Sequence, residues 1–144
     1  MRRPDLTERQ DAMEVVQDVA IAPEAVYDAF IGPRLEDWFA ARGTLNMRPE
    51  PGTPFYFETE FENSRHPHYG RILDLVPGRH IEMTWVTEAG TRGAETVLTI
   101  SLEPIEAGTR VTLRQQGFLD TETSQRHQEA WPRVLKQMET MLGG

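Results

Sequence analysis

Residues 69–85, YGRILDLVPGRHIEMTW, decide the fold class, because they read as two strands joined by a tight turn. Within the turn at residues 76–79, Val-Pro-Gly-Arg, proline stands second and glycine third. That order suits a type II turn, in which glycine takes the positive φ. After the turn, Ile81, Met83 and Trp85 alternate with polar residues, the period of two that marks a strand with one apolar face. The segment therefore predicts an antiparallel hairpin.

The same alternation continues on both sides of this hairpin. Upstream, residues 54–61, PFYFETEF, place Phe55 and Phe57 on one face. Downstream, residues 95–102 and 110–116 alternate in the same way, and residues 13–21 read as a valine-rich first strand. The pattern predicts an antiparallel sheet of about six or seven strands.

Three helices are predicted around this sheet. Pro23 favours a first helical turn, so a short helix should occupy residues 23–31, and a second should follow at 34–40. Residues 122–142 carry a broad apolar stripe and predict one long helix, with a kink or a fresh start near Trp131 because Pro132 lacks an N–H. Strands grouped apart from helices indicate an α+β domain over residues 1–144.

Composition narrows the class of protein. The 144 residues are 38% hydrophobic and 26% charged, as in ordinary globular domains, and the absence of cysteine excludes disulfides and thiolate zinc sites. A net charge of −8 argues against nucleic acid or anionic membranes as partners. No apolar run follows Arg2-Arg3 as a signal requires, and none reaches membrane-helix length. We therefore expect a cytoplasmic protein whose first ten residues are flexible.

Six stretches in order resemble a known family over roughly residues 14–142. They are IAPEAVYDAF at 21–30, LEDWF at 35–39, RPEPGTPFYFE at 48–58, YGRILDLVPGRHIEMTW at 69–85, AGTRVTLRQQGF at 107–118 and HQEAWPRVLKQM at 127–138. The chain resembles the SRPBCC superfamily (START-related and birch-pollen-allergen-like proteins), within it the group named after the activator of heat shock protein 90 ATPase. The resemblance implies a helix-grip fold, a curved sheet wrapped around the C-terminal helix. Pro51-Gly52-Thr53-Pro54 and Ala130 depart from glycines usual in the family.

The resemblance also implies a cavity between sheet and helix. Leu35 and one ring of the pair Trp38 and Phe39 should close the end of the sheet, and the other ring should line the cavity mouth; alternatively both rings belong to the core. The expected lining consists of aromatic, methionine and polar side chains: Trp38, Phe39, Phe55, Phe57, Met83, Trp85, Gln115, Phe118, His127 and Trp131. The same set describes a filled core, which must pack densely.

Three functions remain open. The first is non-catalytic binding of a hydrophobic small molecule, such as a lipid or aromatic metabolite, without cofactor or metal. The second, taken from the family name, is a stress-response module that contacts a chaperone. The third is a cyclase- or dehydratase-like enzyme, for which Asp74 and His127 are the acid–base pair that the sequence offers. Against the third, Asp74 is expected to face solvent or to pair with Arg71.

The remaining histidines suggest little chemistry. His66-Pro67-His68 has the spacing of two metal ligands on a strand, but Pro67 favours an exposed loop and no third ligand is suitably placed. His80 follows the turn and should be solvated. We therefore predict no metal site.

Overall fold

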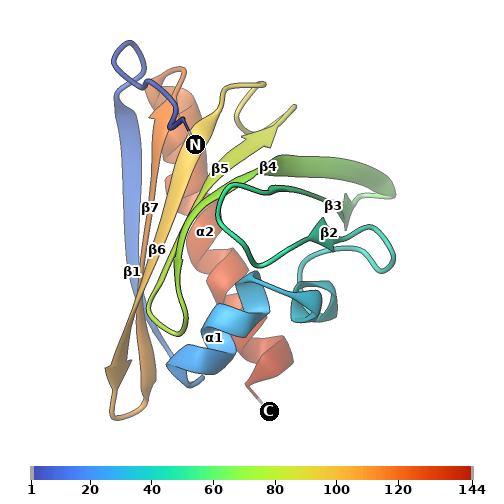
Figure 1. Ribbon diagram of the computed structural model, residues 1–144, viewed down its shortest axis with the longest axis vertical. Helices are drawn as coiled ribbons and strands as arrows, with labels where there is room; N and C mark the ends of the chain where they lie inside the picture. The colour runs from blue at the N-terminus through green and yellow to red at the C-terminus, as the bar shows by residue number, and fades with distance from the viewer. Residues whose placement is uncertain (1, 144) are drawn as a thin grey trace.

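The computed structural model describes residues 2–143 and shows one antiparallel sheet with a long helix against it (Figure 1). In the described chain the strands are β1 (Asp11–Val19), β2 (Asn46–Met47), β3 (Pro54–Phe61), β4 (Ser64–Val76), β5 (His80–Thr87), β6 (Thr96–Ile105) and β7 (Gly108–Phe118). The helices are α1 (Pro23–Phe30), the 3₁₀-helix η1 (Pro33–Asp37) and α2 (Thr121–Leu142). The sheet has seven strands in the order β1-β7-β6-β5-β4-β3-β2, and the predicted α+β helix-grip fold is confirmed.

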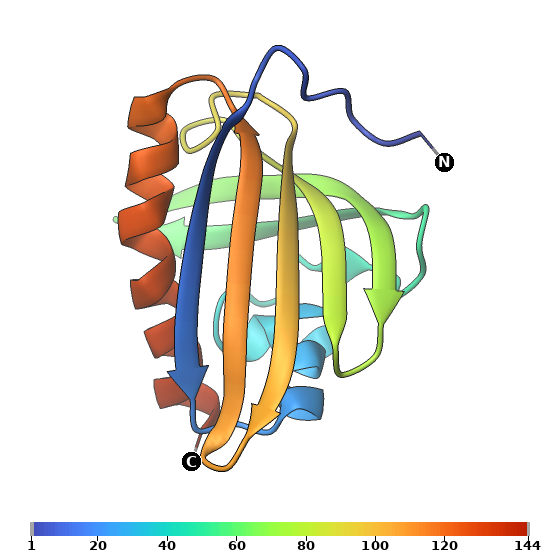
Figure 2. The ribbon, with the colours of Figure 1, turned by 90° about the vertical axis from the view of Figure 1, so that its left-hand side faces the viewer.

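The sheet curves around α2. Figure 2 shows α2 running beside β1, while the β3–β4 hairpin sweeps behind the sheet and back toward the helix. A register shift between Ile72 and Asp74 marks a bulge within the pairing of β4 with β5, and bulges bend strands. Nearby, a Cβ on Gly70 would lie 2.3 Å from the carbonyl oxygen of Thr84, so only glycine permits this close approach. The bend therefore depends on two features of β4, the bulge and Gly70.

Helix α2 is held at its first turn and near its middle. Asp120 caps its first turn by accepting a hydrogen bond from the backbone N–H of Thr123 at 2.9 Å. Of the kink or fresh start predicted near Trp131, the fresh start is wrong, because α2 is a single helix through Pro132. The carbonyl of Pro132 accepts a hydrogen bond from the Gln17 side chain at 3.4 Å, which ties this turn to β1. Within residues 2–143, no helix has the length and apolar character needed to cross a bilayer.

One side chain of α2 protects the open edge of the sheet. Gln128 donates to the backbone carbonyl of Glu14 at 2.7 Å, and its amide oxygen accepts from the backbone N–H of Glu14 at 3.3 Å. An edge strand otherwise presents such groups to solvent and to other chains. The Gln128 amide thus makes, at Glu14 of β1, the two backbone hydrogen bonds that a neighbouring strand would make.

We expect Gln128→Ala to lower the free energy of unfolding by about 1 kcal/mol, since both hydrogen bonds to β1 are lost. Urea denaturation followed by circular dichroism measures the change. Gln125→Ala, at an exposed position of the same helix, is the matched control and should change stability by less than about 0.5 kcal/mol. Equal effects of the two substitutions would contradict a role for the edge contact.

Candidate functional site

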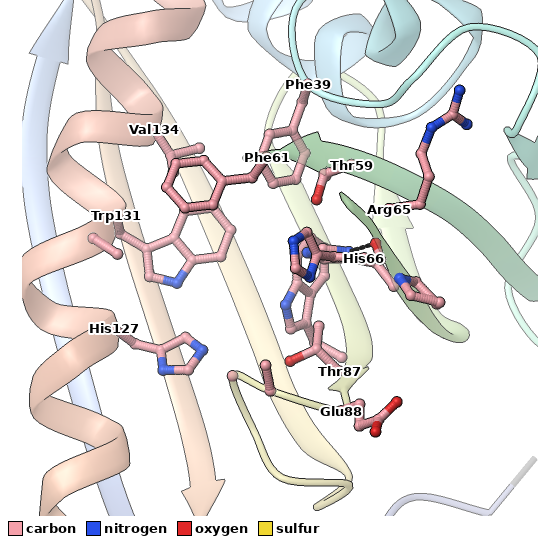
Figure 3. Close-up of a pocket in the computed structure, with 16 residues that line it drawn as sticks. Phe39, Thr59, Phe61, Arg65, His66, Thr87, Glu88, His127, Trp131 and Val134 are labelled. Atoms are coloured by element: carbon pink, nitrogen blue, oxygen red, sulfur yellow. Dashed lines mark hydrogen bonds between the residues drawn. The ribbon is translucent and has the colours of Figure 1, made fainter. Parts of the chain in front are cut away.

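A pocket of about 660 Å³ opens between α2, the β3–β4 hairpin, β5 and the loop after β5 (Figure 3). The lining residues come from these four parts of the chain and from the segment after η1, which supplies Phe39: Phe39, Thr59, Phe61, Arg65, His66, Pro67, His68, Trp85, Thr87, Glu88, Ala89, Gly90, His127, Ala130, Trp131 and Val134. The curvature of the sheet carries the β3–β4 hairpin back toward α2, and the pocket lies between this hairpin and the helix. The site is therefore a consequence of the bend in β4.

Two tryptophans form the apolar floor of the pocket. The rings of Trp85 and Trp131 lie 5.6 Å apart, and both side chains are almost fully buried. The indole N–H of Trp131 donates to the Gln115 side chain at 2.8 Å, and Gln115 donates to the Thr96 hydroxyl at 2.9 Å. Thr96 in turn donates to the carbonyl of Trp85 at 2.6 Å. This buried chain of hydrogen bonds ties the indole of Trp131 to the backbone of Trp85.

The two neighbouring aromatics after η1 stack on each other, with ring centroids 5.1 Å apart, but their other surroundings differ. The 3₁₀-helix ends at Asp37, earlier than the predicted 34–40 helix, so Trp38 and Phe39 follow it rather than sharing a helical face. Trp38 is 3% exposed and its indole N–H donates to the Ala29 carbonyl at 2.9 Å. Phe39 instead lines the pocket, 6.4 Å from the ring of Trp85. Trp38 thus packs against α1, and Phe39 lines the pocket.

Ten residues were expected to line the cavity, and the pocket brings four of them together: Phe39, Trp85, His127 and Trp131. Trp38 lies beside α1, outside this pocket. The other five are buried in the core, each at most 3% exposed: Phe55, Phe57, Met83, Gln115 and Phe118. Their bulk fills the centre between sheet and helix, and the open space is left at one end.

The segment His66-Pro67-His68 was expected to be an exposed loop, and this is wrong. It lies inside β4, where His68 pairs with Phe57 and His66 with Thr59. The turn is made earlier in the chain by Glu62 and Asn63, both with positive φ (52° and 63°). Consecutive positive φ values are typical of a two-residue hairpin turn, and Asn tolerates them. The signal in the sequence was Asn63 between two runs of alternating residues.

His68 is the pocket residue that sequence reasoning missed most clearly. Its ring stacks on Phe57 at 5.0 Å and meets Trp85 edge-on at 5.3 Å. Its Nδ1 lies 2.9 Å from the carbonyl oxygen of His66, and a carbonyl can only accept, so Nδ1 carries the hydrogen. Burial among these rings lowers the pKa of His68 to about 4, so the imidazole is neutral at pH 7.

His127 has the same arrangement on the opposite wall. It extends from α2 into the pocket, and its ring lies 4.7 Å from Phe118 (Figure 3). Its Nδ1 donates to the carbonyl of Thr123 at 2.8 Å. Burial lowers the pKa of His127 as well, which favours the neutral ring. Both walls therefore carry uncharged imidazoles whose Nε2 atoms are hydrogen-bond acceptors.

The charged groups near the pocket do not form an acid–base pair with His127. Asp74 is exposed, lies 3.7 Å from His80 and is not part of the lining. Arg71, its other suggested partner, contacts Glu95 at 3.6 Å. Among residues 2–143, no three His, Cys, Asp or Glu side chains gather as a metal ion would require. The arrangement can hold an apolar molecule and offer it a few polar contacts.

Comparisons with known proteins agree with the fold. A crystal structure of a Chromobacterium violaceum protein is 25% identical, with a TM-score of 0.78, over 93% of this chain and 99% of that one. The AHSA1 protein of Silicibacter pomeroyi is 21% identical, with a TM-score of 0.77, over 92% and 98%. No curated protein matches. The family described as Activator of Hsp90 ATPase homolog 1-like protein matches residues 20–143. Because that match spans most of the sequence, the chain belongs to the Activator of Hsp90 ATPase homolog 1-like family, as the resemblance predicted.

Proposed function

We propose that the pocket binds a small, largely apolar molecule without transforming it. The observation that carries the proposal is the hollow of about 660 Å³ walled by Phe39, Trp85 and Trp131. Ligand pockets in proteins usually measure about 300–1,000 Å³ and combine apolar walls with a few polar groups. Here the polar groups include His68, His127 and Thr87.

Flat aromatic surfaces and neutral imidazoles favour an aromatic metabolite over a flexible lipid chain. Trp85 and Trp131 present rings whose faces and edges suit offset stacking with another ring. Both side chains are almost fully buried and the indole N–H of Trp131 is bonded to Gln115, so little entropy is lost when a ligand binds. A rigid pocket of this kind fits a carrier or sensor of a small molecule.

A ligand screen with a blocked variant tests the proposal. Lipids, sterols and aromatic metabolites are screened by native mass spectrometry and thermal shift. Ala130 lines the pocket on α2, so Ala130→Phe should fill space there and weaken binding of any hit roughly tenfold or more. The matched control is Gln125→Phe, which adds the same ring at an exposed position of the same helix and should leave binding unchanged. Binding that is unaffected by Ala130→Phe would place the ligand elsewhere.

A further inference from the structure

The Nε2 atom of His127 is a pocket acceptor with no protein partner in the described chain. His127 uses its Nδ1–H for the Thr123 carbonyl, and no hydrogen bond within residues 2–143 involves its Nε2. In the same part of the chain, no buried side-chain nitrogen or oxygen is left without a partner. The Nε2 of His127 is therefore accessible, and Figure 3 shows the ring extending toward Thr87. A neutral imidazole nitrogen of this kind accepts a hydrogen bond.

Gly90 keeps the space beside this atom open. A Cβ built on Gly90 would lie 2.6 Å from the Thr87 hydroxyl oxygen and 3.3 Å from the Nε2 of His127. Two hydrogen bonds of ordinary length in series span roughly 6 Å, and these two distances together do not exceed that span. One oxygen atom between Thr87 and His127 can therefore reach both.

The two atoms that flank this space are complementary to a hydroxyl group. The Thr87 oxygen accepts the backbone N–H of Thr91 at 3.0 Å, and its own hydrogen remains available for donation. His127 can only accept at Nε2 while it is neutral. A ligand hydroxyl both donates and accepts, so it satisfies both groups at once.

Charge argues against a carboxylate in the same position. The cation of the lining, Arg65, contacts Glu58 at 3.3 Å and Glu60 at 3.1 Å. Glu88 adds a negative side chain to the rim, and the whole chain has a net charge of −8. A carboxylate would lose its hydration shell here without gaining an unpaired cation.

We propose that the site selects a flat aromatic ligand bearing an uncharged hydroxyl group, of the phenol class, whose hydroxyl lies between His127 Nε2 and the Thr87 hydroxyl beside Gly90. The proposal rests on the proposed function, because it assigns a ligand class to the same pocket. The rings of Trp85 and Trp131 supply the apolar surface, and the polar pair sets the orientation.

Three probes of the same ring size test this selection by isothermal titration calorimetry at pH 7. They are 2-naphthol, 2-methoxynaphthalene, which cannot donate, and 2-naphthoate, which is anionic. We expect 2-naphthol to bind about fivefold to tenfold more tightly than either analogue, as one gained hydrogen bond allows. Equal affinity for 2-naphthol and 2-methoxynaphthalene would overturn the hydroxyl site and leave ligand binding as such intact. If none of the probes binds, both proposals fail for this ligand class.

Variants locate the selective contact. Gly90→Ala places a methyl group between Thr87 and His127, and His127→Phe removes the acceptor while keeping an aromatic ring. In each variant the affinity for 2-naphthol should fall to that for 2-methoxynaphthalene, whereas the affinity for 2-methoxynaphthalene should change little. Gly93→Asn is the matched loop control, because Gly93 has a φ of 79° that Asn tolerates and open space around it. A preference for 2-naphthol that survives in both pocket variants would refute the assignment.

Discussion

Trp131→Ala should destabilise the protein by about 4 kcal/mol, a large part of the stability of an ordinary domain. Trp131 is 4% exposed and its ring lies against Trp85, so its loss leaves a cavity where the helix meets the sheet. Removal of the indole N–H also leaves the buried Gln115 oxygen without its partner. Chemical denaturation measures the effect, and the m-value tests whether unfolding stays two-state.

Graded substitutions separate the ring from its hydrogen bond. Trp131→Phe keeps most of the apolar volume but leaves the Gln115 oxygen unpaired, so we expect a loss of about 2 kcal/mol. Gln115→Leu should cost a similar amount, since it strands the indole N–H of Trp131. The double variant should lose less than the sum of the two, because no polar partner remains unsatisfied. Simple additivity would show that the Gln115 contact contributes little.

The fold follows from features that are local in the sequence. The Val76-Pro77-Gly78-Arg79 turn, the alternating strand at residues 54–61 and the amphipathic helix each specify their structure over a few residues. In the structure they become the β4–β5 turn, β3 and α2, with bounds close to those predicted. Local turn chemistry and hydrophobic periodicity agree in these elements, which is why they can be predicted.

The candidate site depends on packing between distant residues, and this explains the errors. His68 becomes a pocket residue because β4 bends and carries it against Phe57 and Trp85. Pro67 argued for a loop, yet its missing N–H is tolerated in β4 opposite Glu58. Residues such as Phe118 and Met83 face the interior as predicted, but neighbouring side chains fill the space in front of them. Hydrophobic periodicity predicts which face of a strand or helix a residue occupies, but it does not predict how much space the neighbouring side chains leave beside that residue.

The stability of the protein should fall by about 3 kcal/mol between pH 6.5 and pH 4 on account of His68 alone. In the unfolded chain His68 takes up a proton near its ordinary pKa of 6.5, whereas in the folded protein it stays neutral down to about 4. Between these values the unfolded state binds more protons, so lower pH favours unfolding. The contribution is fully present above pH 6.5 and is lost by pH 4. His127, whose pKa is also lowered, adds to the loss in the same direction.

His68→Phe isolates this effect, because it keeps a ring on Phe57 and removes the titrating group. Urea denaturation of both proteins at a series of pH values gives the difference in their free energies of unfolding. The carboxylates are common to both proteins, so their contributions to the pH dependence cancel in this difference. We expect the variant to lose much less stability than the wild type between pH 6.5 and 4, and His68→Gln serves as a second variant if phenylalanine packs poorly. Parallel profiles for wild type and both variants would mean that the His68 imidazole is hydrated in the folded protein. In that case water would reach the contacts of His68 with Phe57 and Trp85, and this side of the pocket would not be dry.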